Sequence, residues 1–146
     1  MIEVKDLKKG FAGKTVIEDV SAVMNAGQCN LIIGASGSGK TVFMKCLVGL
    51  FQPGEGEILY GGQKFTRMNI DEKKEIRKEI GMLFQGSALF SSMTVEENII
   101  FPLDMFTRDS RKKKLERVNE VLERVNLKGA NKKFPAELSG GMMKRV

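Results

Sequence analysis

The N-terminal part of the chain alternates apolar and polar residues with the period of β-strands. Ile2 and Val4 alternate with charged residues, and a second alternating run, residues 15–24, follows the turn between Gly10 and Gly13. We therefore expect two strands within residues 2–24. Three short apolar runs bounded by turn residues, 29–33, 57–60 and 80–84, predict further strands, and 29–33 has the composition of a buried one.

Helical patterns are few in the first half of the chain and dominate the second. Residues 42–48 contain no helix breaker, and residues 70–79 form a charged segment with apolar positions at helical spacing. Apart from these two segments, the patterns up to Phe84 predict mainly strands. We therefore expect a β-rich part that is followed by a helical part.

The helical part begins with a recognisable N-terminal signal. Thr94 and Glu97 have the spacing of a capping box, so a helix should begin there, and Pro102 should limit it. The pattern stays helical to Asn126. Within it, the basic run 111–114 opens a segment with apolar residues on one face, so we interpret this run as a solvated helix surface rather than a patch for anionic lipid.

Composition narrows the class of protein without naming a function. The chain has 146 residues, of which 42% are hydrophobic and 29% charged, which is ordinary for a soluble globular domain. No apolar run approaches bilayer length, and the N-terminus lacks the form of a secretion signal, so we expect a cytosolic protein. Cys29 and Cys46, with no histidine in the chain, exclude the usual zinc spacings; we expect both to be small buried residues. The net charge of +6 is compatible with nucleic acid, a membrane surface or phosphate ligands.

One stretch carries specific chemistry. It satisfies every fixed position of the phosphate-binding loop pattern G-x-x-x-x-G-K-[ST], between an apolar run and a helical run. The glycines let a phosphate approach backbone N–H groups, and the following helix adds its N-terminus. Lys40 should reach the β- and γ-phosphates, and the Thr41 hydroxyl should hold Mg²⁺. An ordinary Gly-Ser turn is the alternative, which the agreement in type, spacing and flanks disfavours. The predicted phosphate-binding residues are Gly34, Ala35, Ser36, Gly37, Ser38, Gly39, Lys40 and Thr41.

A second motif, Leu-Ser-Gly-Gly-Met at 138–142, follows in the helical part. The phosphate-binding loop, Gln85 and the motif at 138–142 follow one another along the chain in that order. With this ordered set, the chain resembles the ATPase domain of ATP-binding cassette (ABC) transporters. The resemblance covers the whole chain. It implies an α/β fold, a P-loop NTPase core of ABC type with an antiparallel β subdomain and a helical subdomain, truncated before the Walker B strand. We expect one incomplete domain, with the β subdomain and nucleotide-binding core at 1–85 and the helical subdomain at 86–146.

The resemblance also implies roles for single residues. Phe11 lies where the family stacks an aromatic ring on adenine, although periodicity alone favours a core residue. Gln85 lies where the family's glutamine helps to hold Mg²⁺ and senses the membrane subunit; with Lys40 it is a predicted catalytic residue, and a polar strand end is the alternative. The motif at 138–142 would contact the γ-phosphate on the loop of a second copy, with an N-cap serine and a flexible turn as the alternative. Its members are Leu138, Ser139, Gly140, Gly141 and Met142.

Two departures from the family pattern bear on function. Met142 replaces the usual glutamine, and together with residues 82–90 it looks most like the ATPases of lipid-transporting maintenance-of-lipid-asymmetry systems, the partners of mammalian-cell-entry proteins. The family's Asp-Glu strand and switch histidine do not follow the motif, and residues 98–104 are only a superficial match to that strand. We therefore expect the first part of a longer domain, inactive in hydrolysis and poorly soluble by itself.

The leading hypothesis is the ATP-binding subunit of an ABC transporter that uses ATP and Mg²⁺ to drive transport, with lipid as the cargo. It implies a head-to-tail dimer of two copies and an integral-membrane permease that contacts residues 86–106. The subunit would be cytoplasmic, peripheral on the inner face of the cell membrane, with no insertion into the bilayer and no nucleic-acid partner. The alternatives are a soluble ABC ATPase of translation or repair and a non-catalytic nucleotide-binding interaction module.

Overall fold

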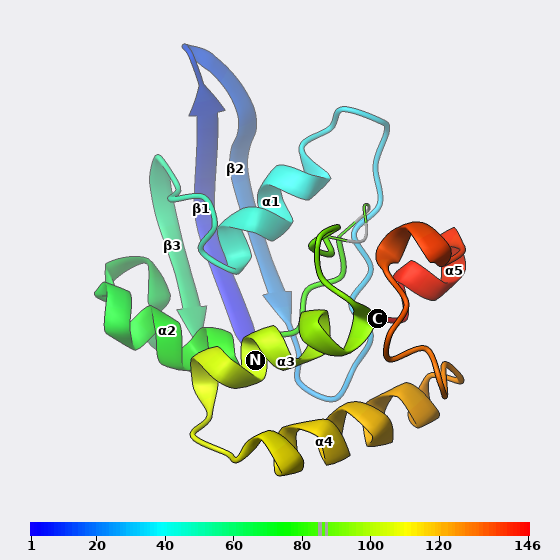
Figure 1. The fold of residues 1–146 in the computed structure, drawn as a ribbon. Helices are drawn as coiled ribbons and strands as arrows, with labels where there is room; N and C mark the ends of the chain where they lie inside the picture. Colours follow the sequence, from blue (N-terminus) through cyan, green and yellow to red (C-terminus); the bar gives the residue numbers. More distant parts are fainter. Residues whose placement is uncertain (85, 87) are drawn as a thin grey trace. The chain divides into compact units, whose positions relative to one another are not determined.

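The computed structural model describes residues 1–84, 86 and 88–146. These residues form two compact units, Met1–Ile80 and Gly81–Val146, and each is described by itself. The first unit contains the strands and two helices, and the second is helical (Figure 1). None of the described helices is both long and apolar enough to cross a membrane.

The first unit is built on one antiparallel sheet. Its strands are β1 (Ile2–Phe11), β2 (Lys14–Met24), β3 (Glu55–Tyr60) and β4 (Gln63–Lys64), in the spatial order β2-β1-β3-β4. Figure 1 shows β1 between β2 and β3. The central strand β1 pairs Ile2 with Met24 on one side and with Tyr60 on the other. The strands expected within 2–24 and at 57–60 are therefore confirmed.

Two helices accompany the sheet. α1 (Lys40–Leu47) buries Phe43, Cys46 and Leu47 against sheet residues, and the 3₁₀ turn η1 (Phe65–Arg67) adds Phe65 to the same core. α2 (Ile70–Lys78) starts with a capping box between Asn69 and Glu72. None of its residues is fully buried, as expected for a segment with so many charged residues. The core that α1 completes contains Val4, Leu7, Ile17, Phe43, Cys46, Leu47, Ile58 and Phe65.

Two predicted strands are not formed. Residues 29–33 and 80–84 have no strand structure, and Leu31 and Ile33 are 82% and 81% exposed. The reason is that a strand exists only through ladder hydrogen bonds to a neighbour, and the described strands pair with one another without including either run. Cys29 shares this exposure, so its predicted burial is wrong, whereas Cys46 is buried as expected.

The second unit packs two long helices around its own core. α3 (Val95–Phe106) and α4 (Arg111–Arg124) are followed by the 3₁₀ turn η2 (Pro135–Glu137) and the short α5 (Gly140–Met143). Ser110 caps α4, so the helical pattern is interrupted between residues 106 and 111. The core comprises Val95, Ile100, Val118, Leu122, Leu127, Ala130 and Leu138.

The prediction that Pro102 limits the helix after Thr94 is wrong. α3 contains Pro102 and continues to Phe106. Proline removes one backbone donor, but Ile100 is buried beside it, and both the backbone N–H and the hydroxyl of Thr107 donate to the Leu103 carbonyl oxygen. Burial and this C-terminal closure outweigh the lost hydrogen bond.

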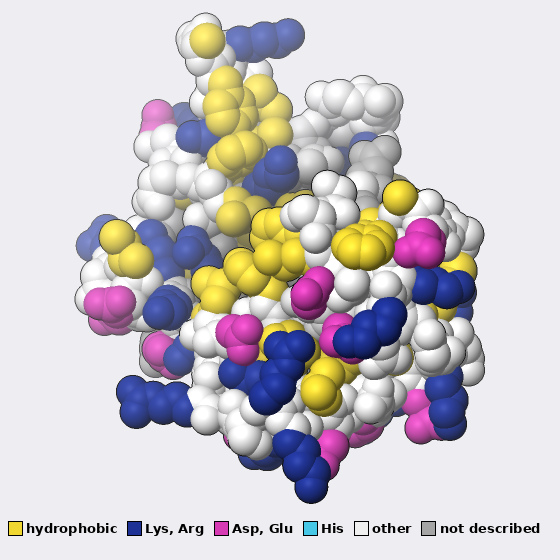
Figure 2. Space-filling view, viewed as in Figure 1, with side chains coloured by type: hydrophobic (Ala, Val, Ile, Leu, Met, Phe, Trp, Pro, Cys, Tyr) yellow, Lys and Arg dark blue, Asp and Glu magenta, His cyan; other side chains and the backbone are white. Residues whose placement is uncertain are grey.

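The basic run at 111–114 lies at the start of α4, as predicted. Lys113 pairs with Asp109 and Lys114 with Asp104, both at 2.7 Å. The Lys113 side chain is exposed, whereas that of Lys114 lies one turn before the buried Val118 and is itself only 11% exposed. Figure 2 shows acidic side chains interspersed with the basic ones over this region. For Arg111, Lys112 and Lys113, which are exposed, this favours the interpretation of a solvated, charge-balanced helix surface, while Lys114 is largely covered.

Candidate phosphate-binding site

The loop 34–41 turns directly into the first helix of the protein. α1 begins at Lys40, and Gly39, its N-cap, adopts the left-handed conformation with φ 89°. A Cβ at Gly39 would lie 2.9 Å from the Val16 carbonyl oxygen on β2. Glycine is therefore required at this position for both its backbone angle and its close approach to the sheet.

The start of α1 is open to an anion. Gly39 provides no side-chain cap, and the first turn of the helix contains no acidic residue. The first N–H groups of a helix have no partner within it, and the helix dipole places partial positive charge there. A Cβ at Gly37 would meet nothing within 4 Å, so the loop leaves room beside its backbone. The backbone thus fits a phosphate group.

Lys40 folds back over its own loop. Its Nζ donates to the carbonyl oxygens of Gly34 and Ala35, each at 2.7 Å. The same loop is closed by a hydrogen bond from the Ser38 N–H to the Ala35 carbonyl oxygen at 3.2 Å. The ammonium group is consequently held at the loop, and Thr41 lies exposed in the first turn of α1.

Phe11 lies at the end of β1, at the hairpin that joins β1 to β2. The residue is 41% exposed, its ring packs edge-to-face with that of Phe51 at 5.1 Å between centroids, and the Lys9 ammonium lies 4.9 Å from its centroid. It is outside the buried core. Phe11 pairs with Lys14, two residues from the Val16 carbonyl that Gly39 approaches, which is about 7 Å along a strand. The aromatic ring and the loop therefore belong to neighbouring parts of one unit.

The motif at 138–142 forms the start of α5. Ser139 is the N-cap, and its Oγ accepts a hydrogen bond from the Met142 N–H at 3.2 Å. Leu138 is buried in the core of the second unit, and Met142 packs against that core, so these two side chains anchor the motif. A Cβ at Gly140 or Gly141 would meet nothing within 4 Å. The N-cap accounts for the serine, while packing within the described chain does not account for the two glycines.

The sequence motifs are divided between the units. The loop and Phe11 belong to Met1–Ile80, and the motif at 138–142 belongs to Gly81–Val146. Gln85 lies outside the described residues.

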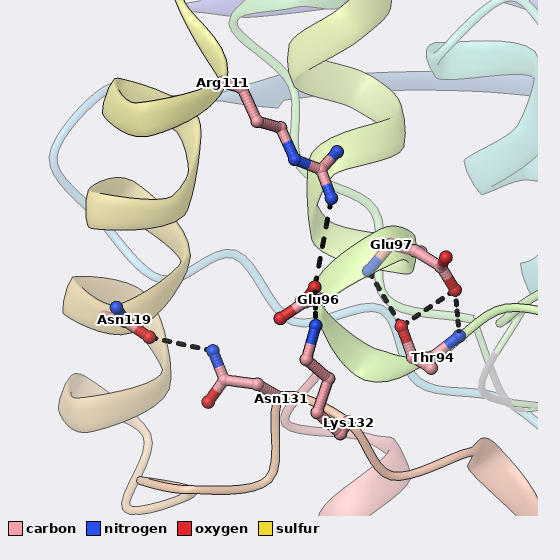
Figure 3. A network of polar contacts seen from close by, with 7 residues as sticks. All are labelled: Thr94, Glu96, Glu97, Arg111, Asn119, Asn131 and Lys132. Atoms are coloured by element: carbon pink, nitrogen blue, oxygen red, sulfur yellow. Dashed lines mark hydrogen bonds and ion pairs between the residues drawn. The ribbon is translucent and has the colours of Figure 1, made fainter.

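A polar network that sequence reasoning missed supports the segment leading to the second motif (Figure 3). Glu96 is 5% exposed, and Lys132 donates to its Oε1 at 2.6 Å, with Arg111 at 3.9 Å. The first N–H groups of α3, those of Val95 and Glu96, donate to the carbonyl oxygens of Lys133 and Asn131. The connector, residues 128–138, thus satisfies donors that a helix start leaves unpaired. These partners lie some 36 residues apart, and no local pattern indicates them.

Comparison with known proteins decides the family. The sequence pattern of the ABC transporter family matches residues 17–146. The chain belongs to this family. The ABC fold expected from the motifs is supported independently by a solved dimeric ATP-binding cassette in a post-hydrolysis state, bound to ADP and Pi, with a TM-score of 0.88 and 29% identity over 99% of this chain and 66% of that one.

Curated ABC relatives match the full extent of the chain. The probable ribonucleotide transport ATP-binding protein mkl of Mycobacterium leprae is 44% identical over 99% of this chain and 42% of its own length. The intermembrane phospholipid transport system ATP-binding protein MlaF of Haemophilus influenzae is 37% identical over the whole chain and 55% of its own length. The chain therefore spans about half the length of these ABC proteins, whose names give different cargoes.

Proposed function

We propose that the protein is the ATP-binding subunit of an ABC transporter and couples ATP binding and hydrolysis to transport. The observation that carries this proposal is the loop 34–41: a left-handed glycine, an uncapped helix start and the Lys40 ammonium meet at one place. Backbone N–H groups and a lysine bind the phosphate groups of a nucleoside triphosphate in loops of this kind. Membership of the ABC transporter family supports the same function.

Each residue of the site has a separate task in this proposal. The N–H groups of the loop bind the β-phosphate, and Lys40 exchanges its two carbonyl partners for phosphate oxygens. Thr41 and Gln85 hold Mg²⁺, for which hydroxyl and amide oxygens are suitable ligands. The exposed face of Phe11 accepts the adenine ring. Mg-ATP supplies the phosphoanhydride bond whose cleavage by water drives the cycle.

The decisive test replaces the cation of the loop in the full-length protein. Lys40→Met should weaken binding of a fluorescent ATP analogue by about tenfold or more, because a charge-assisted contact to phosphate is lost. Lys112→Met, an exposed lysine of α4, is the matched control and should bind as the wild type. Equal affinity of Lys40→Met and the control would refute the assignment.

The second copy of the chain is a further part of the proposal. The solved cassette that binds ADP and Pi is dimeric, and the open space at Gly140 and Gly141 leaves the start of α5 accessible to a partner. In a head-to-tail dimer, Ser139 of one copy faces the γ-phosphate on the loop of the other.

Mixed dimers test this arrangement. Lys40→Met on one copy and Ser139→Arg on the other should damage one of the two sites twice and leave the second intact. Both substitutions on the same copy should damage each site once. Identical nucleotide occupancy in the two kinds of dimer would contradict the head-to-tail arrangement.

A membrane permease is the proposed third component, and it places the subunit at the inner face of the membrane. An apolar surface suitable for it lies on the second unit. The rings of Phe90 and Phe101 pack at a tilted angle with their centroids 4.8 Å apart, and both residues are exposed, as is Met105 one helical turn further. Exposed clusters of this kind are typical of protein interfaces. Asn98 fixes the loop by donating to the Phe90 carbonyl oxygen.

Substitution on this surface tests the permease contact. Phe90→Asp with Phe101→Asp should release the permease while the melting temperature stays near that of Leu50→Ser, a substitution of an exposed apolar residue in the first unit. Retained co-purification of the permease would exclude this surface.

Lipid is the proposed cargo. Residues 82–90 and Met142 resemble the lipid-transport ATPases, and one relative is named for phospholipid transport, whereas another is named for ribonucleotides. Lipid exchange between vesicles by the reconstituted transporter, with and without ATP, distinguishes the two. ATP-dependent movement of ribonucleotide and not of phospholipid would overturn the cargo.

A further inference from the structure

The C-terminal end of α1, opposite the phosphate loop, is bound by side chains from later elements. Arg77 of α2 donates from Nε to the Val48 carbonyl oxygen at 3.0 Å and from Nη2 to the Gly49 carbonyl oxygen at 2.6 Å. The Tyr60 hydroxyl of β3 donates to the Leu47 carbonyl oxygen at 2.8 Å. Three consecutive carbonyl groups at the end of one helix are therefore held from outside it.

These bonds meet an electrostatic need. The last carbonyl groups of a helix have no intrahelical partner and carry partial negative charge, which a guanidinium group stabilises. Burial raises the pKa of the Tyr60 hydroxyl, so the group remains protonated and able to donate. The contacts join residues 13 to 29 positions apart, which makes them tertiary rather than local.

The backbone at Gly49 is shaped for this contact. Gly49 has φ 71°, and a Cβ there would lie 2.8 Å from Nη2 of Arg77 and 2.9 Å from the ring of Phe65. A left-handed glycine after a helix is the usual C-terminal cap. Here it also leaves the room that lets the guanidinium reach the helix end.

Geometry connects this end of α1 to the loop at its other end. α1 has eight residues, so it is about 12 Å long, and a tilt of about 10° about one end displaces the other by about 2 Å. So short a helix derives its orientation from tertiary contacts. Gly39 against Val16 fixes one end, and the bonds from Arg77 and Tyr60 fix the other.

We propose that Arg77, assisted by Tyr60, is a positioning residue for the phosphate loop: it holds the far end of α1 so that the N–H groups at its start point to the phosphates. This inference rests on the proposed nucleotide-binding function. Arg77 is exposed, so its removal leaves no cavity in the core, and its effect falls on the direction of α1.

The test uses the full-length protein and a fluorescent ATP analogue. Arg77→Met should weaken binding by about tenfold, the range expected for losing hydrogen bonds from a charged group. Arg77→Lys keeps the charge but not the paired donors, and should recover part of the affinity. Lys74→Met, at an exposed position of the same helix, is the control and should bind as the wild type.

A second measurement needs no nucleotide. The backbone amide resonances of residues 37–41 should shift in Arg77→Met and in Tyr60→Phe, and stay in place in Lys74→Met. If Arg77→Met fails to fold, Tyr60→Phe decides, because it removes only the hydroxyl and keeps the ring that packs on Phe65. Unchanged amide resonances and unchanged affinity in both variants would overturn the inference.

Failure of the wider proposal is recognised separately. If Lys40→Met binds nucleotide like the wild type, the nucleotide-binding function is wrong, while shifted amides in Arg77→Met still show that Arg77 positions the loop. If Lys40→Met loses binding while the Arg77 and Tyr60 variants keep both their affinity and their amide resonances, the function stands and the positioning role is wrong.

Discussion

Three glycines of the first unit hold positions that another residue would disrupt. Gly39, Gly49 and Gly56 all have positive φ, and a Cβ on each would lie within 3 Å of a neighbouring atom. Gly39 allows the phosphate loop to approach β2, and Gly49 admits Arg77. Gly56 lies on β3 beside a bulge of β1 at Asp6, itself at φ 48°. At this scale, the missing side chain determines how closely two backbones approach.

Gly56→Ala should destabilise the first unit more than Gly62→Ala. Both positions have φ above 80°, so both pay a strain cost of about 1 kcal/mol. Only the Cβ at Gly56 would lie 2.4 Å from the Asp6 carbonyl oxygen, whereas nothing lies within 4 Å at Gly62. We expect an additional loss of about 2 kcal/mol for Gly56→Ala. Urea unfolding of the two variants checks this, and equal losses would contradict it.

The start of α3 shows how an element is stabilised from several sides. Glu97 accepts hydrogen bonds from the N–H and the hydroxyl of Thr94, while connector carbonyls accept from Val95 and Glu96. The two bonds from Thr94, first that of its backbone N–H and then that of its hydroxyl, hold the pKa of the Glu97 carboxyl below its ordinary value. The capping box is local in sequence, whereas the connector bonds are not.

The lowered pKa of Glu97 predicts a pH dependence of stability. A carboxylate whose pKa is lower in the folded state stabilises that state above its ordinary pKa of about 4.3, and the stabilisation is lost as the pH falls through the folded value. Glu97→Gln should therefore reduce stability at neutral pH and make little difference in acid. Urea unfolding from roughly pH 7 to pH 3 measures this. Glu116→Gln on exposed α4 is the control. A constant gap between wild type and Glu97→Gln at every pH would contradict the assignment.

For the whole molecule, the main feature is that two units with separate cores carry different motifs. The phosphate loop belongs to the first core and the motif at 138–142 to the second. The first unit also exposes Leu31 and Ile33 in the segment that leads to the loop. Apolar residues exposed on backbone that lies outside a helix or strand favour association between chains.

We predict that this exposed segment governs the solubility of the 146-residue chain. Leu31→Ser with Ile33→Ser should shift the sedimentation profile of the purified chain from aggregates toward monomer, because the apolar surface available for association is reduced. Val23→Ser with Leu50→Ser, exposed residues of β2 and of the segment after α1, is the control. Aggregation that persists in the double variant at 31 and 33 would place the association elsewhere.

Much of this protein follows from its sequence because the determining interactions are local. Alternation within 2–24 predicted β1 and β2, the spacing of Thr94 and Glu97 predicted the start of α3, and the glycine pattern at 34–41 predicted a loop that opens a helix. Each depends on neighbours within a few residues, so the chain's own order contains the information. The motifs at 34–41 and 138–142 are also short runs of consecutive residues, so the sequence alone was sufficient to assign the chain to the ABC family.

Tertiary structure decided what local patterns could not. The apolar run at 29–33 has strand composition, yet a strand needs a partner, and the structure pairs the described strands with one another. Pro102 should end a helix, yet burial of Ile100 on the same element carries α3 past it. The Glu96–Lys132 pair and the bonds of Arg77 to the end of α1 join residues some 30 positions apart. Such contacts depend on how the chain folds back on itself, and sequence spacing does not encode that.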